Sequence, residues 1–132
     1  AKVNAENLNL SNRTHFKVCD IKNYNIGKYD LIISNPPYIP SKDIKNLSKD
    51  IIHHEPKSAL DGGIDGLDLM KKVIYKSNCL LKRNGVLALE IGFNQYYKVS
   101  KLLKHYRFRE MGKEYDYNRN VRCIISTKVG FF

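Results

Sequence analysis

Ser34-Asn35-Pro36-Pro37-Tyr38-Ile39-Pro40 follows directly after the apolar run Tyr29-Asp30-Leu31-Ile32-Ile33. A short apolar run that stops at two prolines is typical of a buried strand that ends in a stiff loop. Proline fixes its own φ angle and donates no hydrogen bond to a neighbouring strand. The loop contains one amide side chain, two adjacent rings without N–H donors and one phenol. The sequence therefore predicts a rigid corner at the end of a strand, with a few polar groups held in place.

The rest of the chain alternates between strand-like and helix-like patterns. Alternating apolar residues predict strands, whereas apolar residues three and four positions apart predict amphipathic helices. We expect strands at 14–19, 29–34, 86–91, 108–115 and 121–127, and helices at 1–10, 67–83 and 94–106. Residues 116–120 are expected to join the last two strands as a hairpin. The pattern predicts an α/β open sheet with an antiparallel pair of strands at its closing edge.

Residues 41–66 form a long polar excursion. A loop of this length in a compact domain is usually functional, for example as a lid or a binding edge. His53-His54-Glu55 could suggest a metal site, but no second ligand cluster exists and adjacent side chains need not converge. Asp61–Gly66 resembles the start of a calcium loop, yet Lys72 stands where a bidentate glutamate is needed. We therefore expect no metal.

The composition, with 42% hydrophobic and 27% charged residues, is ordinary for a single globular domain of 132 residues. No run approaches the roughly 18 apolar residues that span a bilayer, and no signal-peptide layout is present. We expect a cytoplasmic protein without a membrane partner. Cys19, Cys79 and Cys123 lie far apart in apolar runs, which predicts reduced, buried thiols.

The net charge of +10 is compatible with a nucleic-acid partner. Lysine, asparagine and isoleucine dominate the sequence, and their codons are A/T-rich, so coding bias accounts for much of this charge. The lysines are scattered along the chain rather than clustered. We therefore favour coding bias, and the charge by itself decides no function.

The residues Asn35-Pro36-Pro37-Tyr38 resemble the signature of amino-methylating enzymes that use S-adenosylmethionine. The continuation Tyr38-Ile39-Pro40, followed by Glu55-Pro56, Ala59-Leu60 and Asp61-Gly62-Gly63, is similar to the HemK/PrmC family. Members of that family methylate the glutamine side-chain nitrogen of peptide chain release factors. The likeness extends over almost all of the 132 residues.

The resemblance implies the C-terminal part of a Rossmann-like class I methyltransferase, whose strand order is 3-2-1-4-5-7-6. The expected strands of this chain would be strands 3 to 7. Residues 1–132 would thus form a partial methyltransferase domain that lacks the first two strands and the glycine-rich loop, and no Gly-x-Gly-x-x-Gly occurs here. Strands lie about 4.8 Å apart, so this omission would leave a gap of roughly 14 Å between strands 3 and 4. We expect the chain to begin inside a larger protein and to bind cofactor weakly alone.

The corner residues suit methyl transfer to an amide, because an amide nitrogen is a poor nucleophile whose protons must be held by acceptors. The side-chain carbonyl of Asn35 and the backbone carbonyl of Pro36 can serve as two fixed acceptors at about 2.7–3.2 Å. Tyr38 offers a flat face on which a planar amide or base can stack. We therefore predict Asn35, Pro36 and Tyr38 as catalytic residues, with no general base.

Other site residues are implied by the resemblance. Pro37 and Glu55 would shape the substrate pocket, and Asp20 would lie near the adenine amine of the cofactor with Ile21 against the ring and Asn35 nearby. Asp20 reads equally well as a turn or helix-cap aspartate. Glu90 ends a strand near the same edge, and Arg122 matches a family arginine whose preceding aspartate-glycine pattern is altered here, so its role stays open.

Three functions remain after these observations. The first is N5-methylation of the glutamine in the Gly-Gly-Gln loop of a release factor, with S-adenosylmethionine as cofactor. The second is N6-adenine methylation of DNA or RNA with a flipped base. Against it, the sequence shows no separate target-reading segment and no aromatic-rich basic patch. The third is an inactive remnant or interaction module.

Overall fold

The computed structural model describes residues 1–130, without the side chain of Lys49. The longer elements, in chain order, are α1 (Lys2–Asn7), β1 (Tyr29–Ser34), α2 (Lys49–His54), α3 (Lys57–Leu60), α4 (Asp68–Leu80), β2 (Leu81–Glu90), α5 (Tyr96–His105), β3 (Phe108–Tyr115) and β4 (Val121–Lys128). Three short 3-10 helices are η1 (Ser11–Arg13), η2 (Ile21–Asn23) and η3 (Ile44–Asn46).

The strands form one four-stranded sheet in the order β1-β2-β4-β3. β1 and β2 are parallel, and β4 pairs antiparallel with both β2 and β3. Ala88 lies at the centre of the sheet, opposite Ile33 on one side and Ile125 on the other. The predicted antiparallel closing pair is therefore confirmed, and the order matches strands 4-5-7-6 of the fold that the resemblance implies.

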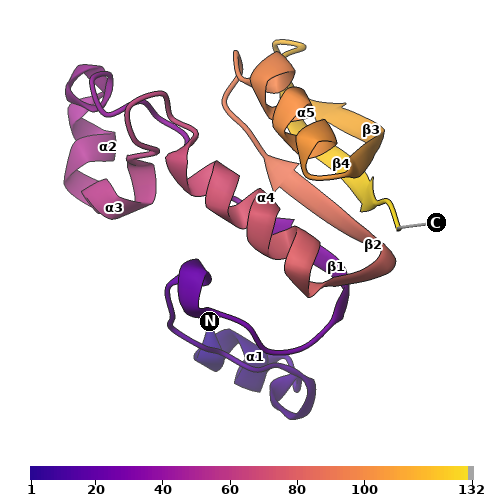
Figure 1. The fold of residues 1–132 in the computed structure, drawn as a ribbon. Coiled ribbons are helices and arrows are strands. Elements are labelled where there is room, and N and C mark those ends of the chain that lie inside the picture. Colours follow the sequence, from indigo (N-terminus) through magenta and orange to yellow (C-terminus); the bar gives the residue numbers. More distant parts are fainter. Residues whose placement is uncertain (131–132) are drawn as a thin grey trace.

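The hydrophobic core lies between the sheet and two helices, and α4 and α5 lie on the same side of the sheet (Figure 1). α4 connects two parallel strands, which need a crossover of this kind. The core side chains are almost fully buried; they include Met70 and Ile74 of α4, Val99 and Leu103 of α5, Leu87 and Leu89 of β2, and Ile124 of β4. The apolar residues that recur at helical spacing in the sequence thus form the faces of α4 and α5 that pack on the sheet.

β1 is an edge strand in the part of the chain that the structure describes, because β2 is its only partner there. The side chains of Leu31 and Ile33 on β1 are 51% and 74% exposed. An apolar strand with one free edge and exposed side chains is unusual in a native domain, because it invites pairing with another chain.

Residues 14–19 do not form the predicted strand; they have no regular secondary structure and no strand partner, and Phe16 and Val18 are exposed. Alternation alone cannot make a strand when no neighbouring strand is there to accept its hydrogen bonds. In the implied order, this segment would pair with strands that the chain lacks.

Other boundaries differ by a few residues. The predicted helix 67–83 ends at Leu80, because Leu81 already pairs with Tyr29 at the start of β2. The helix expected at 94–106 spans Tyr96–His105, and the strands 29–34 and 108–115 have the predicted bounds. The excursion at 41–66 contains η3, α2 and α3.

The cysteines are free, but the prediction that all three are buried is wrong. Cys19 lies in the unpaired segment and Cys79 lies on the outer side of α4, so both are exposed. Cys123 is half-buried on β4, and this burial raises the pKa of its thiol. Among residues 1–130, no helix has both the length and the apolar character needed to cross a membrane.

Candidate active site

The corner predicted from the sequence leaves the carboxyl end of β1. Pro36 is buried, whereas the side chain of Asn35 is exposed. Among residues 1–130, nothing donates a hydrogen bond to the Asn35 side-chain oxygen or to the Pro36 carbonyl oxygen. The two proposed acceptor oxygens are thus not used in hydrogen bonds within the described part of the fold.

Two cavities meet at this corner. The larger, of about 690 Å³, is lined by Cys19, Asp20, Ile21, residues 32–37, Ser58, Leu69, Val73, Ser77 and Leu80. The second, of about 350 Å³, is lined by residues 35–39, Glu55, Ala59 and Leu60. Residues 35–37 line both cavities. The structure therefore brings the predicted cofactor residues to one side of the corner and the predicted substrate residues to the other.

Asp20 caps η2, as one of the two interpretations of the sequence predicts. Its Oδ1 accepts a hydrogen bond from the backbone N–H of Lys22 at 2.9 Å, and the Lys22 ammonium lies 3.4 Å from Oδ2. The backbone hydrogen bond holds the pKa of Asp20 below its usual value, so the group is a carboxylate at neutral pH. Ile21 packs against the core. The capping role does not conflict with a ligand role, because the side chain is 46% exposed.

Glu55 follows α2, is exposed, and lines the second cavity as the resemblance implies. In the same excursion, His54 Nδ1 lies 2.8 Å from the backbone oxygen of Asp50. Within the described residues, no three His, Cys, Asp or Glu side chains gather closely enough to hold a metal ion.

The carboxylate of Asp61 holds the two ends of the excursion together. It accepts hydrogen bonds from the Ser41 hydroxyl at 2.6 Å and from the Gly63 N–H at 3.0 Å. The Ser41 bond, together with the Gly63 bond, lowers the pKa of Asp61. The Gly62 N–H donates to the Ile39 carbonyl at 2.8 Å. The Asp61-Gly62-Gly63 segment is therefore joined to the corner by a backbone hydrogen bond to Ile39.

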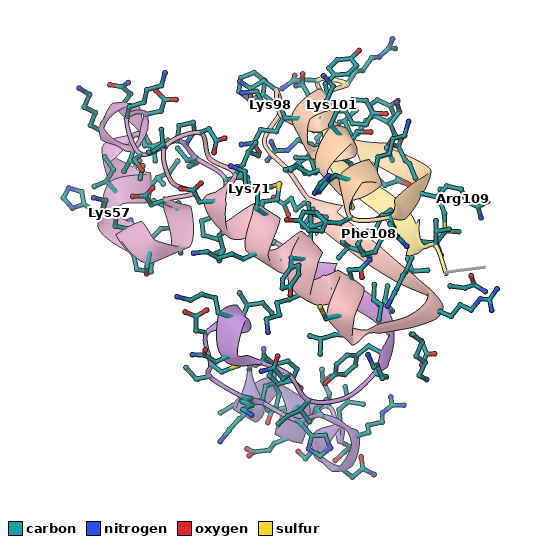
Figure 2. The ribbon with its side chains drawn as sticks, in the orientation of Figure 1. Lys57, Lys71, Lys98, Lys101, Phe108 and Arg109 are labelled. Carbon is teal, nitrogen blue, oxygen red and sulfur yellow. The ribbon has the colours of Figure 1, made fainter. Side chains whose placement is uncertain are left out.

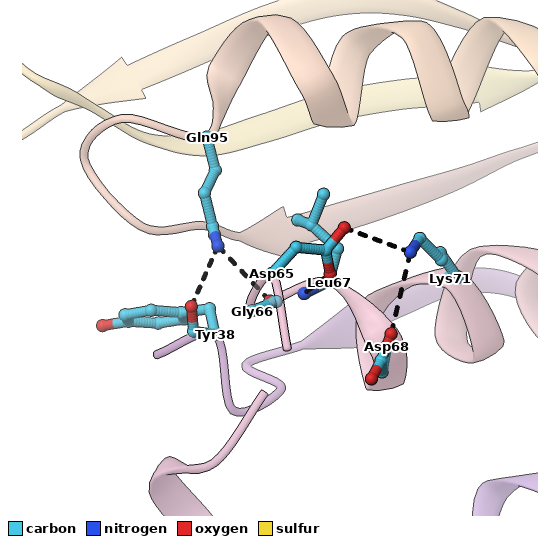
Figure 3. Close-up of polar contacts among 7 residues, drawn as sticks. All are labelled: Tyr38, Asp65, Gly66, Leu67, Asp68, Lys71 and Gln95. Atoms are coloured by element: carbon cyan, nitrogen blue, oxygen red, sulfur yellow. Dashed lines mark hydrogen bonds and ion pairs between the residues drawn. The ribbon is translucent and has the colours of Figure 1, made fainter. Parts of the chain in front are cut away.

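Gln95 is a site residue that the sequence reasoning missed. Its Nε2 donates to the backbone oxygen of Tyr38 at 2.9 Å and to that of Gly66 at 3.3 Å (Figure 3). Its Oε1 accepts from the Gly92 N–H at 2.9 Å. The side chain is only 5% exposed. One buried amide thus connects the corner, the excursion and the end of β2. The sequence signal that could have indicated Gln95 is its position, as an amide side chain at the start of the predicted amphipathic helix.

The hydroxyl of Tyr38 contacts two charged residues. The Arg122 Nη2 donates to it at 2.8 Å, and the hydroxyl itself donates to Glu90 Oε1 at 3.3 Å. Arg122 and Glu90 form an ion pair at 3.8 Å, and Arg122 Cζ lies 5.3 Å from the centre of the Tyr38 ring. Glu90 therefore does more than end β2. Arg122, whose role the sequence leaves open, contacts both the hydroxyl and the ring of Tyr38.

Positive charge is less evenly distributed than the sequence first indicated. Residues 91–109 contain five Lys or Arg residues and no Asp or Glu. Lys98 and Lys101 lie exposed on α5 (Figure 2). None of residues 91–109 lines either of the two cavities at the corner. The charge of this helix is thus separate from the site.

Comparison with solved structures shows a methyltransferase fold. The chain superposes with a TM-score of 0.59 on an O-methyltransferase family protein from Burkholderia thailandensis, with 11% identity over 99% of this chain and 40% of that one. The TM-score is 0.53 for a protein from Thermus thermophilus described as a putative DNA modification methylase, with 16% identity over 85% of this chain and 51% of that one. The chain has the mixed α/β fold of the Rossmann-like methyltransferases.

The family model described as Eco57I restriction-modification methylase matches residues 1–127, and the chain belongs to that family. The chain is also 34% identical to the release factor glutamine methyltransferase of Clostridium acetobutylicum, over 98% of its own length and 47% of the relative. It is 38% identical to the enzyme of that name from Rhodospirillum rubrum, over 95% of its length and 38% of the relative.

A third relative, the ribosomal protein uL3 glutamine methyltransferase of Francisella tularensis, is 40% identical over 73% of this chain and 31% of its own length. The resemblance to the release factor glutamine methyltransferases is thus confirmed. The chain spans less than half the length of these relatives.

Proposed function

We propose that this chain supplies the substrate-binding part of an enzyme that transfers a methyl group to the side-chain amide nitrogen of a glutamine. The observation that carries this proposal is that residues 35–37 line both cavities, so that a group bound on one side can meet a group bound on the other. Transfer between two bound partners needs such a shared wall. The names of the relatives point to glutamine as the acceptor.

The residues of the larger cavity suit the adenosine end of S-adenosylmethionine. A carboxylate with a lowered pKa, that of Asp20, can accept from an exocyclic amine, and Ile21 offers an apolar surface to a planar ring. When bound, this cofactor supplies an electrophilic methyl sulfonium. Asn35 would lie at the boundary where that methyl group meets the substrate.

The residues of the corner act on the substrate nitrogen. The Asn35 side-chain oxygen and the Pro36 carbonyl oxygen would accept the two amide hydrogens, which orients the developing lone pair toward the methyl group. Pro37 and Tyr38 would form the wall against which the planar amide lies, and Glu55 would contribute to the lining of the same cavity. After transfer, the nitrogen carries a positive charge and loses a proton readily, so no general base is needed.

We further propose that residues 1–132 are a partial domain. The free edge of β1, its exposed apolar side chains and the unpaired segment 14–19 all have the features expected where further strands would fit between them. Such strands would also supply the glycine-rich loop for the methionine part of the cofactor. The proposed site of action is the cytoplasm, where peptide chain release factors work.

The second candidate is N6-adenine methylation of a nucleic acid. It is favoured by the description of the family model, which names a restriction-modification methylase. An adenine amine needs the same two acceptors and the same stacking ring. The corner geometry alone does not separate the two substrates, whereas relatives of 34–40% identity bear glutamine methyltransferase names.

The test is methyl transfer from labelled S-adenosylmethionine by the full-length protein, meaning the longest protein that its reading frame encodes. The acceptors would be a release factor, its Gln→Ala variant in the Gly-Gly-Gln loop, and an adenine-containing DNA duplex. We expect label in the unchanged release factor alone. Label in the DNA, or equal label in both release factors, would refute the glutamine proposal. Calorimetry with S-adenosylmethionine tests the partial domain, since equal affinity of this chain and the full-length protein would contradict it.

A further inference from the structure

We propose that Arg122 and Glu90 are positioning residues that hold the Tyr38 ring as a fixed wall of the substrate cavity, while Gln95 holds the backbone of the same residue. This inference rests on the proposed function, because Tyr38 is the expected stacking surface for the substrate amide. It assigns a role to three residues that lie outside the Asn-Pro-Pro-Tyr corner itself.

The hydroxyl end of Tyr38 is held by groups from two central strands. Glu90 is the last residue of β2 and Arg122 is the second residue of β4. Cys123 of β4 is paired with Glu90 in the sheet, so the carboxylate and the guanidinium come from adjacent, rigid strands. Arg122 donates to the phenol oxygen and Glu90 accepts from it, which uses both the donor and an acceptor position of the hydroxyl.

The presentation of Arg122 depends on the turn before β4. The carboxylate of Asp116 accepts hydrogen bonds from the N–H groups of Asn118 and Asn120, each at 2.9 Å. These bonds close the hairpin between β3 and β4 and set the start of β4. The family's aspartate-glycine pattern is altered here, yet the turn is still closed by an aspartate.

The backbone end of Tyr38 is held by Gln95. The amide of Gln95 and the hydroxyl of Tyr38 lie at opposite ends of the tyrosine (Figure 3). With both ends bonded, neither a swing of the side chain about its Cα–Cβ bond nor a shift of the loop can occur without breaking hydrogen bonds to partly or fully buried groups. Fixing a side chain before substrate arrives removes an entropy cost from the bound and transition states.

Arg122 and Glu90 act through Tyr38 because neither residue lines the substrate cavity, whereas Tyr38 does. The ion pair is also only partly buried, with 29% and 39% of the two side chains exposed, so it contributes little to folding by itself. An arginine retained only for stability would be easy to replace. An arginine that holds the Tyr38 side chain in place would change turnover when it is replaced.

The experiment is a double-mutant cycle in the full-length protein, with methyl transfer to a release factor as the readout and kcat and KM measured separately. The variants are Arg122→Met, Tyr38→Phe and the two together, with Arg122→Lys as the conservative variant. Arg122→Met and Tyr38→Phe are each expected to lower kcat/KM by about tenfold, and the double variant to be no worse than Tyr38→Phe within about twofold. Arg122→Lys should recover part of the loss, since an ammonium can donate to the same hydroxyl.

The control variant is Lys101→Met, which removes one exposed positive charge from α5, away from both cavities. It should leave kcat/KM unchanged, and so excludes a general effect of net charge on the encounter with substrate. Thermal unfolding of each variant separates loss of folding from loss of positioning. A loss of activity that follows only the unfolding temperature would refute the proposal.

Two other outcomes would also overturn it. If the losses of Arg122→Met and Tyr38→Phe multiply in the double variant, Arg122 acts on the substrate or elsewhere and not through the hydroxyl. If Arg122→Met leaves kcat/KM unchanged, Arg122 has no positioning role. The variant Asn35→Ala in the same assay separates failure of the positioning role from failure of the proposed function. Full activity of Asn35→Ala would refute the assigned chemistry. An inactive Asn35→Ala, together with losses from Arg122→Met and Tyr38→Phe that multiply, would refute only the positioning role.

Discussion

The side-chain amide of Gln95 donates a hydrogen bond to the backbone oxygen of Tyr38 at 2.9 Å, although 57 positions separate the two residues in the chain. The same nitrogen also reaches the Gly66 carbonyl at 3.3 Å. The Asn-Pro-Pro-Tyr corner is therefore fixed not only by its own prolines but also by the residue just before α5. The prolines make the Asn-Pro-Pro-Tyr segment stiff, whereas the hydrogen bonds of Gln95 fix where the segment lies.

Replacement of Gln95 by glutamate should destabilise the protein strongly. Glutamate has nearly the same shape, but its carboxylate would face the carbonyl oxygens of Tyr38 and Gly66 with no proton to donate. Two buried hydrogen bonds would be lost and the charge would be desolvated, so we expect a loss of about 2–4 kcal/mol in the free energy of unfolding. Urea titration of the full-length protein measures this. Asn94→Asp, an exposed neighbour that makes no such bond, should change stability by less than about 0.5 kcal/mol. Equal effects of the two changes would contradict the assigned role of Gln95.

Gly66 is expected to tolerate no side chain. Its φ angle is +72°, and a Cβ atom would lie 2.3 Å from the Tyr38 carbonyl oxygen. Gly66→Ala should therefore cost at least about 2 kcal/mol of stability, through backbone strain and displacement of the corner. Gly112→Ala is the matched control, because no atom beyond Gly112 and its two chain neighbours lies within 4 Å of the position that its added methyl carbon would take, and its φ angle is not positive. The midpoints of urea unfolding compare them, and a Gly66→Ala variant as stable as Gly112→Ala would show that the loop adjusts freely.

Much of the fold could be predicted from local pattern. The strands at 29–34 and 108–115 have the predicted bounds, and each finds a neighbour in the sheet. Residues 14–19 have the clearer alternation but no neighbour, so the local pattern predicted a strand that does not form. Sequence alternation reports which face a residue would present, and it contains no information about whether a partner strand is present.

The candidate site could be predicted where its residues are adjacent in sequence. Asn35, Pro36 and Tyr38 belong to one short motif, and the structure places them along one cavity wall. The partners of Tyr38 could not be found this way, because Glu90, Gln95 and Arg122 come from 52 to 84 positions away. The contact between Glu90 and Arg122 also depends on the register of β2 against β4. Long-range hydrogen bonds of this kind leave only a weak trace in a single sequence.

The pH dependence of stability should include a contribution from Asp116. Its hydrogen bonds, chiefly to the N–H of Asn120, lower its pKa below the ordinary value of 3.8. A group with a lowered pKa in the folded state stabilises that state above its unfolded pKa, and this contribution is lost as the pH falls through the folded value. The contribution should thus be complete at about pH 6 and decline below about pH 4. The difference in urea midpoint between the unchanged protein and Asp116→Asn, measured from about pH 7 down to about pH 3, should shrink on acidification. A difference that stays constant over this range would contradict the role of the ionised carboxylate.

Asn35 should affect turnover without affecting folding. Its side chain is exposed and makes no hydrogen bond within residues 1–130, so Asn35→Ala should change the free energy of unfolding by less than about 0.5 kcal/mol. The same change removes one of the two proposed acceptors for the substrate amide hydrogens, and we expect kcat to fall by about 10²–10³-fold in the full-length protein. Asn35→Asp keeps an acceptor oxygen in the same place and should retain more activity than Asn35→Ala. The measurement is methyl transfer to a release factor at saturating cofactor. Asn35→Ala with unchanged kcat, or with a loss confined to KM, would show that the amide oxygen does not act in the transition state, because an acceptor that only binds the ground state raises KM and leaves turnover intact.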